Sequence, residues 1–80
     1  MKNVKDYISI DPEIMGGQAV FRGTRVTIEA LFDHLENGIT LDDFLADFPT
    51  VSKEAAVAVI EIASKIMSSK DIQKLYETAA

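Results

Sequence analysis

The sequence of 80 residues predicts a mainly α fold with a short N-terminal β-hairpin, a three-helix, helix-turn-helix-like core and a C-terminal helical segment. Two observations predict this fold class. Apolar residues form short runs before residue 27 and recur at helical spacing after it, and capping residues precede the expected helices. We therefore expect a single domain over residues 1–80, divided into a hairpin region (1–26), a helical core (27–68) and a C-terminal helical segment (69–80).

Two short apolar runs predict the strands of the hairpin. Residues 7–10 alternate in polarity, with Ile8 and Ile10 expected on one face, and residues 19–21 form the second run. Between them a proline ends the first strand, because proline cannot donate to a ladder, and a glycine pair provides a turn. Such short strands are not stable alone in water, so they must pack on the helices or on another chain.

Apolar residues spaced i, i+3, i+4 and i+7 predict the first two helices of the core. The first follows Thr27 as its N-cap and ends at Asn37 and Gly38, where glycine favours the left-handed C-cap conformation. The second follows Thr40, which matches a capping box with Asp43 in place of the commoner glutamate, and it ends before a proline. These lengths and turns are typical of a helix-turn-helix-like core.

The third helix is expected over residues 53–68, with Ser52 as its N-cap. Its apolar residues cover more than one face, and a helix of this kind is buried on more than one side. An 80-residue monomer has little material to cover it, so we expect a homodimer or higher homo-oligomer with Val59, Ile62 and Ile66 in the interface.

The C-terminal segment is weakly amphipathic. Ile72, Leu75 and Tyr76 share one face, which we expect to point inward, and the last residues are expected to fray.

Composition favours a binding protein of the cytoplasm. The chain has no cysteine and one histidine, so we expect no metal site and no cofactor. No segment approaches the roughly 20 apolar residues of a membrane span, and no secretory signal is recognisable, so we expect no membrane partner. The net charge of −5 disfavours nucleic-acid binding by the whole surface and favours a positively charged protein partner.

Acidic residues line the first two helices, with no lysine or arginine between Ile28 and Pro49. Three interpretations remain open: solvated helix faces, a carboxylate metal site, and a docking surface for a basic partner. His34 has no serine or cysteine partner in a catalytic setting and is expected to be a surface or boundary residue with no special role, so we expect no enzyme. The six acids are Glu29, Asp33, Glu36, Asp42, Asp43 and Asp47.

The only two arginines of the sequence lie close together, in the segment of residues 22–25. Our candidate contacts to DNA or a partner protein are the four residues of this segment, Arg22, Gly23, Thr24 and Arg25. Two guanidinium groups on one turn can hold phosphates or carboxylates bidentately. The alternative is that the arginines fix the hairpin to acids on the helices, such as Glu29 or Asp33. Lys53, beside the N-terminus of the third helix, is a further candidate phosphate contact.

The hairpin region and the first two helices carry a set of residues at fixed spacing: Asp11, Pro12, Glu13, Ile14, Gly16, Gly17, Val20, Arg22, Gly23, Thr24, Arg25, Val26, Gly38, Thr40, Asp43, Phe48 and Pro49. In these residues the chain resembles the bacterial family catalogued as domain of unknown function 433, over roughly residues 8–63. Gln18 and Ala19 stand where the family commonly has Lys-Pro, which removes one cation from the hairpin.

The resemblance implies a helix-turn-helix-like fold with an N-terminal hairpin. Members are often described as antitoxins of type II toxin–antitoxin pairs, encoded beside a PIN-like nuclease toxin. It thus implies a protein that binds and neutralises such a toxin and also binds its own operator DNA. The alternative is a helix-turn-helix-like transcriptional regulator without a toxin partner, and a metal-dependent hydrolase is a third, weaker hypothesis.

Overall fold

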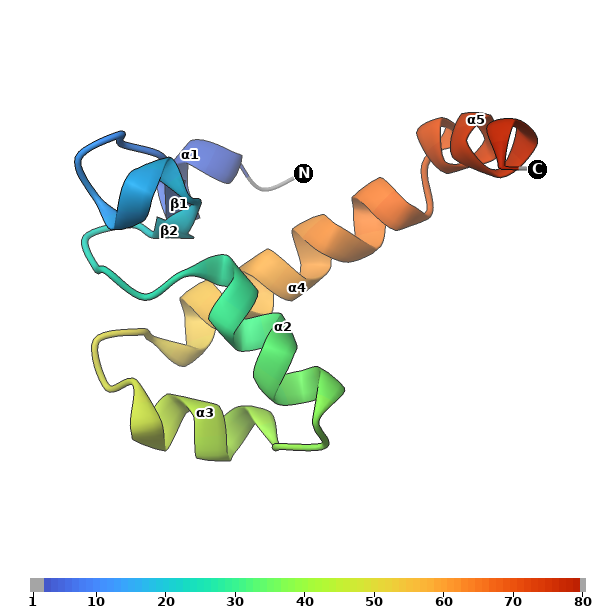
Figure 1. Cartoon of the computed structure of the whole chain (residues 1–80). Coiled ribbons are helices and arrows are strands. Elements are labelled where there is room, and N and C mark those ends of the chain that lie inside the picture. The colour runs from blue at the N-terminus through green and yellow to red at the C-terminus, as the bar shows by residue number, and fades with distance from the viewer. Residues whose placement is uncertain (1–2, 80) are drawn as a thin grey trace.

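The computed structural model describes residues 3–79 and confirms the predicted fold class (Figure 1). A two-stranded hairpin and one short helix precede three helices that enclose the core, and a last helix follows. The elements are α1 (Val4–Tyr7), β1 (Ile8–Ser9), the 3-10 turn η1 (Met15–Gly17), β2 (Val20–Phe21), α2 (Ile28–Glu36), α3 (Leu41–Asp47), α4 (Lys53–Met67) and α5 (Lys70–Thr78).

The hairpin forms as predicted but with shorter strands. β1 pairs antiparallel with β2, placing Ile8 opposite Phe21 and Ser9 opposite Val20. The expectation that Ile8 and Ile10 share one face of a strand is wrong, since β1 ends at Ser9; Ile8 is half-buried, whereas Ile10 is 70% exposed. The chain leaves the ladder after Ser9 because the following loop makes its own bonds, and the hairpin instead buries both residues of β2.

The three predicted N-caps are confirmed. The side-chain oxygen of Thr27 accepts a hydrogen bond from the Ala30 amide at 3.1 Å, and Thr40 and Ser52 do the same for their helices. Each bond satisfies an amide that the first turn leaves unpaired. Gly38 ends α2 with a φ of 77°, a backbone conformation that favours glycine.

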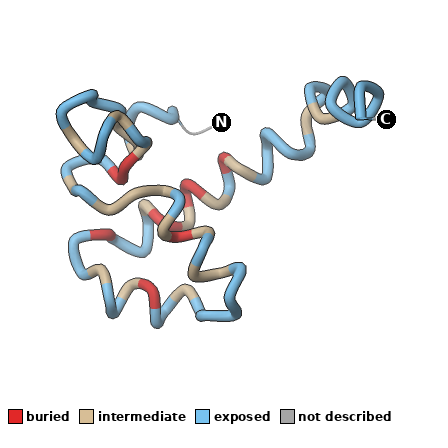
Figure 2. The backbone as a smooth tube through the Cα atoms, in the orientation of Figure 1, coloured by how far each residue is buried: buried red, intermediate tan, exposed pale blue. Residues whose placement is uncertain are grey.

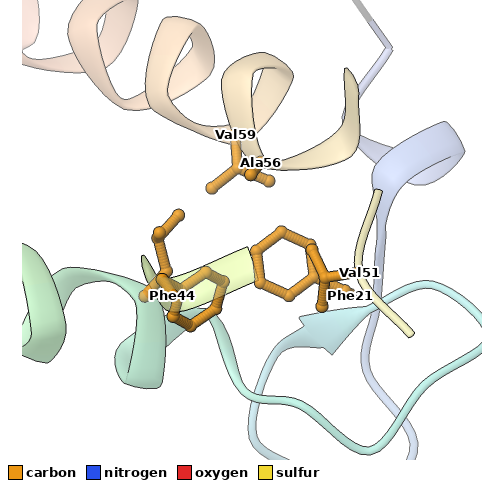
Figure 3. Close-up of a cluster of buried hydrophobic side chains, with 6 residues drawn as sticks. Phe21, Phe44, Val51, Ala56 and Val59 are labelled. Atoms are coloured by element: carbon orange, nitrogen blue, oxygen red, sulfur yellow. The ribbon is translucent and has the colours of Figure 1, made fainter. Parts of the chain in front are cut away.

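The core joins the hairpin to all three central helices (Figure 2). In Figure 3 the Phe21 and Phe44 rings lie close to the helix that carries Ala56 and Val59, and the ring centroids are 6.3 Å apart. Burying one such side chain contributes about 1.5–3 kcal/mol, so the hairpin is fixed to the helices through Phe21. The buried cluster consists of Phe21, Leu31, Phe44, Val51, Ala56 and Val59.

The chain itself covers the second apolar face of α4. The one-turn helix α1, which we did not predict, packs against α4, and Val4 lies beside Ile62 and Ile66. Val59 and Ile62 are 2% and 7% exposed and are therefore buried within a single chain, whereas Ile66 is 60% exposed. Two of the three residues expected in a dimer interface thus belong to the interior of the chain.

Residues 68–79, which we call the arm, extend away from the rest of the molecule. Figure 1 shows α5 beyond the C-terminal end of α4. No residue of α5 is buried, and Leu75 and Tyr76 are 64% and 82% exposed. The expectation that these two residues face inward is therefore wrong. The physical reason is that α4 has already passed the core when the chain turns at Ser69. None of the described helices combines the length and apolar character that crossing a membrane requires.

Candidate binding surface at the turn of residues 22–25

Backbone and hydroxyl hydrogen bonds close the turn of residues 22–25, which we call the arginine turn. The Phe21 amide donates to the Val26 carbonyl at 2.9 Å, and the Thr24 amide donates to the Phe21 carbonyl at 3.0 Å. The Thr24 hydroxyl also donates to Phe21 and accepts from the Val26 amide. Gly23 has a φ of 77°. Thr24 and Gly23 therefore shape the turn, and the two arginines project from it.

Arg22 fixes the hairpin to α1. Its guanidinium donates to the Lys5 carbonyl at 2.8 Å, and its backbone amide donates to the Tyr7 carbonyl at 2.9 Å. Arg22 thus contacts a backbone oxygen rather than the carboxylates of Glu29 or Asp33 that the alternative interpretation named. Part of its donor capacity is used within the chain.

Arg25 differs from Arg22 in its surroundings. Its residue is exposed, and within residues 3–79 its guanidinium makes no hydrogen bond or ion pair. A guanidinium carries five N–H donors in a planar fork that matches carboxylate and phosphate groups. Arg25 is therefore the cation of this turn that is free to contact a partner.

A depression of about 450 Å³ lies between the arginine turn and the start of α4. Its lining carries one guanidinium, from Arg22, together with the acidic residues Asp6 and Glu54. Two carboxylates beside one cation disfavour a phosphate, which is itself negative, and suit a protein surface with both charges. The lining residues are Asp6, Tyr7, Arg22, Gly23, Ser52, Glu54 and Ala55.

Lys53 does not join the arginines. Its ammonium lies 3.9 Å from a carboxylate oxygen of Asp42 on α3, and both side chains are largely exposed. An exposed pair of this kind contributes about 0–1 kcal/mol, so Lys53 remains accessible to solvent. The structure therefore places the three candidate cations in three different settings.

The six acids of α2 and α3 are all exposed. Within residues 3–79, no group of three or more histidine, cysteine or acidic side chains is arranged to hold a metal ion. The six exposed carboxylates thus lie on two helices that carry no lysine or arginine, and we call this set of residues the acidic surface.

His34 lies against the aromatic part of the core. Its Nδ1 is 2.7 Å from the Ala30 carbonyl, to which it donates in the tautomer with hydrogen on Nδ1. The ring meets Phe44 and Phe48 edge-on, with centroids 5.3 and 5.4 Å away. Edge-to-face contacts of aromatic rings are favourable. His34 therefore has a packing role, which its position one residue off the apolar stripe did not reveal.

The helices, the hairpin and the exposed charged turn define a small helix-turn-helix-like protein with a β-hairpin at its N-terminal side. Residues 8–63 match the model of DUF433, a family described as proteins of unknown function, and the chain belongs to this family. The family predicted from the sequence is thereby confirmed.

A solved structure agrees with this assignment. The chain is 26% identical to a DUF433 member protein from Anabaena variabilis ATCC 29413, whose crystal structure superposes with a TM-score of 0.66. The comparison covers 96% of this chain and 72% of that chain. No curated protein matches the chain.

Proposed function

We propose that the protein is an antitoxin-like regulatory protein that binds and neutralises a PIN-like nuclease toxin in the cytoplasm and is not itself an enzyme. The observation that carries this proposal is the acidic surface, whose six carboxylates are exposed and whose helices carry no lysine or arginine. Such a surface is complementary to a protein that is built to bind phosphates.

A nuclease needs a cationic surface because its substrate carries one negative charge for each phosphate. An acidic protein approaches that surface faster than a neutral one, since complementary potentials steer the encounter. Once bound, it occupies the region that the nucleic acid requires. Inhibition then follows from steric and electrostatic exclusion.

The arginine turn supplies contacts of the opposite sign. Arg25 is free to bind a carboxylate of the partner, and the adjacent depression offers one cation and two anions. Mixed charges of this kind improve specificity, because a wrong partner leaves like charges facing one another.

The proposal is tested by purifying the tagged chain from its native host and weighing the complex by light scattering. A stoichiometric small nuclease that is inactive in the complex and active after separation is the expected result. A chain with no bound protein, and no toxicity from the neighbouring genes, would overturn the proposal.

Charge variants then test the acidic surface. Changing Asp33 and Asp47 to asparagine should slow association with the nuclease several-fold at low salt, with little effect at high salt. The matched control changes Glu13 and Glu61 to glutamine, which removes the same two charges outside α2 and α3 and should slow association less. Equal effects of the two double variants would show that net charge alone matters.

A second function, binding of operator DNA, is favoured by two observations: Arg25 is exposed and makes no hydrogen bond or ion pair within residues 3–79, and Lys53 lies at the start of α4. Binding of operator DNA is expected both of an antitoxin that represses its own operon and of a regulator without a toxin partner. Fluorescence anisotropy with the upstream DNA measures it, and Arg25→Ala should reduce the salt slope by about 1 if Arg25 contacts a phosphate. Absence of salt-dependent binding would exclude this function.

A further inference from the structure

Asn37 and Gly38 begin the turn that joins α2 to α3, and both residues are exposed (Figure 1). An asparagine that precedes a glycine is especially prone to deamidation in water, because glycine lacks the Cβ that would shield its amide from the neighbouring side chain. The other asparagine of the sequence, Asn3, precedes Val4, whose β-branched side chain crowds the amide between them. The sequence therefore contains one asparagine that is chemically poised to react with its own backbone.

The reaction at Asn37 needs water as its only co-reactant. The Gly38 amide nitrogen attacks Cγ of Asn37 and closes a succinimide ring, while the side-chain nitrogen leaves as ammonia and takes the amide proton with it. Water then adds to one of the two ring carbonyls and breaks its bond to the ring nitrogen. Addition at Cγ gives aspartate, and addition at the backbone carbonyl gives isoaspartate, whose main chain runs through the side chain. Either product carries a carboxylate in place of a neutral amide.

The folded turn holds the two reacting groups apart. The Asn37 side-chain nitrogen donates to the Asp33 carbonyl at 2.7 Å, which directs the side chain back along α2. The Gly38 amide donates to the Leu35 carbonyl at 3.1 Å. Ring closure requires the Gly38 nitrogen to eclipse the Asn37 Cβ, but with ψ at 12° it nearly eclipses the Asn37 nitrogen instead. The reaction therefore cannot begin until the turn opens.

Opening of this turn does not require unfolding of the core. Residues 36–40 are exposed, and the turn is held by the hydrogen bonds of a Schellman motif, in which the Ile39 amide also donates to the His34 carbonyl at 2.9 Å. Exposed helix ends open locally at a smaller free-energy cost than packed helices do. The turn thus closes over the reactive pair for most of the time and releases it in brief openings.

We propose that Asn37 is a site of spontaneous deamidation, that its rate is set by local opening of the turn, and that its products weaken the end of α2. A carboxylate cannot donate to the Asp33 carbonyl, and it adds negative charge at a helix C-terminus, which is already negative. It also stands four residues after Asp33, a spacing at which like charges repel. The proposal goes beyond the proposed function, because it requires neither a toxin nor DNA.

Peptide mapping by mass spectrometry tests the site. The purified chain is kept at mildly alkaline pH, sampled over several weeks and digested, and the aspartate and isoaspartate forms of each asparagine peptide are separated by chromatography. We expect both forms to accumulate at position 37 well before any product at Asn3, which is the control within the same sample. Absence of product at position 37, or equal conversion of the two asparagines, would overturn the proposal.

Comparison of the folded chain with the chain unfolded in urea tests the role of the turn. At the same pH, Asn37 should deamidate about tenfold faster or more in urea, because the folded turn is closed for most of the time. Hydrogen exchange of the Gly38 amide measures the opening independently and should show protection of similar size. Equal deamidation rates in the two conditions would show that the turn does not control the reaction.

A matched pair of variants tests the effect of the product on α2. Asn37→Asp and Asn37→Ala both remove the bond to the Asp33 carbonyl, but only the first adds a charge. Urea denaturation should show that Asn37→Asp raises the equilibrium constant of unfolding about tenfold and Asn37→Ala about threefold. An Asn37→Asp chain as stable as the unchanged chain would refute the weakening of α2.

Discussion

The Lys5 carbonyl accepts a hydrogen bond from the Arg22 guanidinium at 2.8 Å, so the turn after β2 is fixed to the first helix. Arg25, three residues later, makes no such bond within residues 3–79. Two arginines that the sequence presents as a pair therefore perform separate tasks. One stabilises the hairpin region, and the other remains available for binding.

We expect Arg22→Ala to lower the free energy of unfolding by about 1 kcal/mol, the net contribution of a typical hydrogen bond. Arg25→Ala should change it by less than about 0.5 kcal/mol, as surface substitutions without contacts do. Urea denaturation followed by circular dichroism measures both. Equal losses would mean that the bond to Lys5 adds nothing to stability.

Arg25→Ala also tests binding separately from stability. Arg25→Ala should weaken the partner complex about tenfold, which corresponds to one lost charged contact of roughly 1.4 kcal/mol. Its unfolding midpoint should stay at that of the unchanged chain. Isothermal titration calorimetry with the purified partner measures the affinity, and unchanged binding would remove Arg25 from the interface.

The loop between the strands contains three successive residues with positive φ, namely Met15, Gly16 and Gly17. Gly16→Ala should destabilise the chain by about 1 kcal/mol because of this backbone conformation, although its Cβ would meet nothing within 4 Å. Met15→Gly should be neutral or slightly stabilising, since it relieves the same strain while adding freedom to the unfolded chain. The midpoint temperature of thermal unfolding compares the two variants. An unchanged midpoint for Gly16→Ala would show that this backbone conformation does not strain an alanine.

The aromatic group around His34 should depend on the shape of its rings. His34→Ala removes the edge contacts to Phe44 and Phe48 and the bond to Ala30, and should cost about 1–2 kcal/mol. Asp33→Ala, its exposed neighbour on α2, should cost less than about 0.5 kcal/mol. Guanidinium denaturation measures the free energy of unfolding of both variants. Equal values would show that His34 has no packing role and is the surface or boundary residue that its sequence position predicts.

Local rules of the chain predicted much of the fold. Thr27, Thr40 and Ser52 combine a capping side chain with a following apolar stripe, and both signals depend on residues within one or two turns. We did not predict the helix α1, because a single turn is too short to show the helical periodicity of apolar residues. Residues 7–10 alternate like a longer strand, but the loop after Ser9 ends the ladder.

The candidate site was less predictable, since it depends on contacts distant in sequence. Arg22 and Arg25 have the same chemistry, and only the position of α1, seventeen residues before Arg22, distinguishes them. The apolar excess of α4 indicated a dimer, yet the N-terminal segment of the same chain covers part of it. For α5 the spacing predicted an amphipathic helix correctly, but spacing alone does not say whether a partner surface lies within reach.

The extended arm also has a consequence for the lifetime of the chain. A nine-residue helix is marginal in water without packing, so α5 is expected to open more readily than the packed helices α2, α3 and α4. We therefore expect a protease to cut the purified chain within α5 before it cuts the packed helices, and a partner that covers the arm to slow this cut.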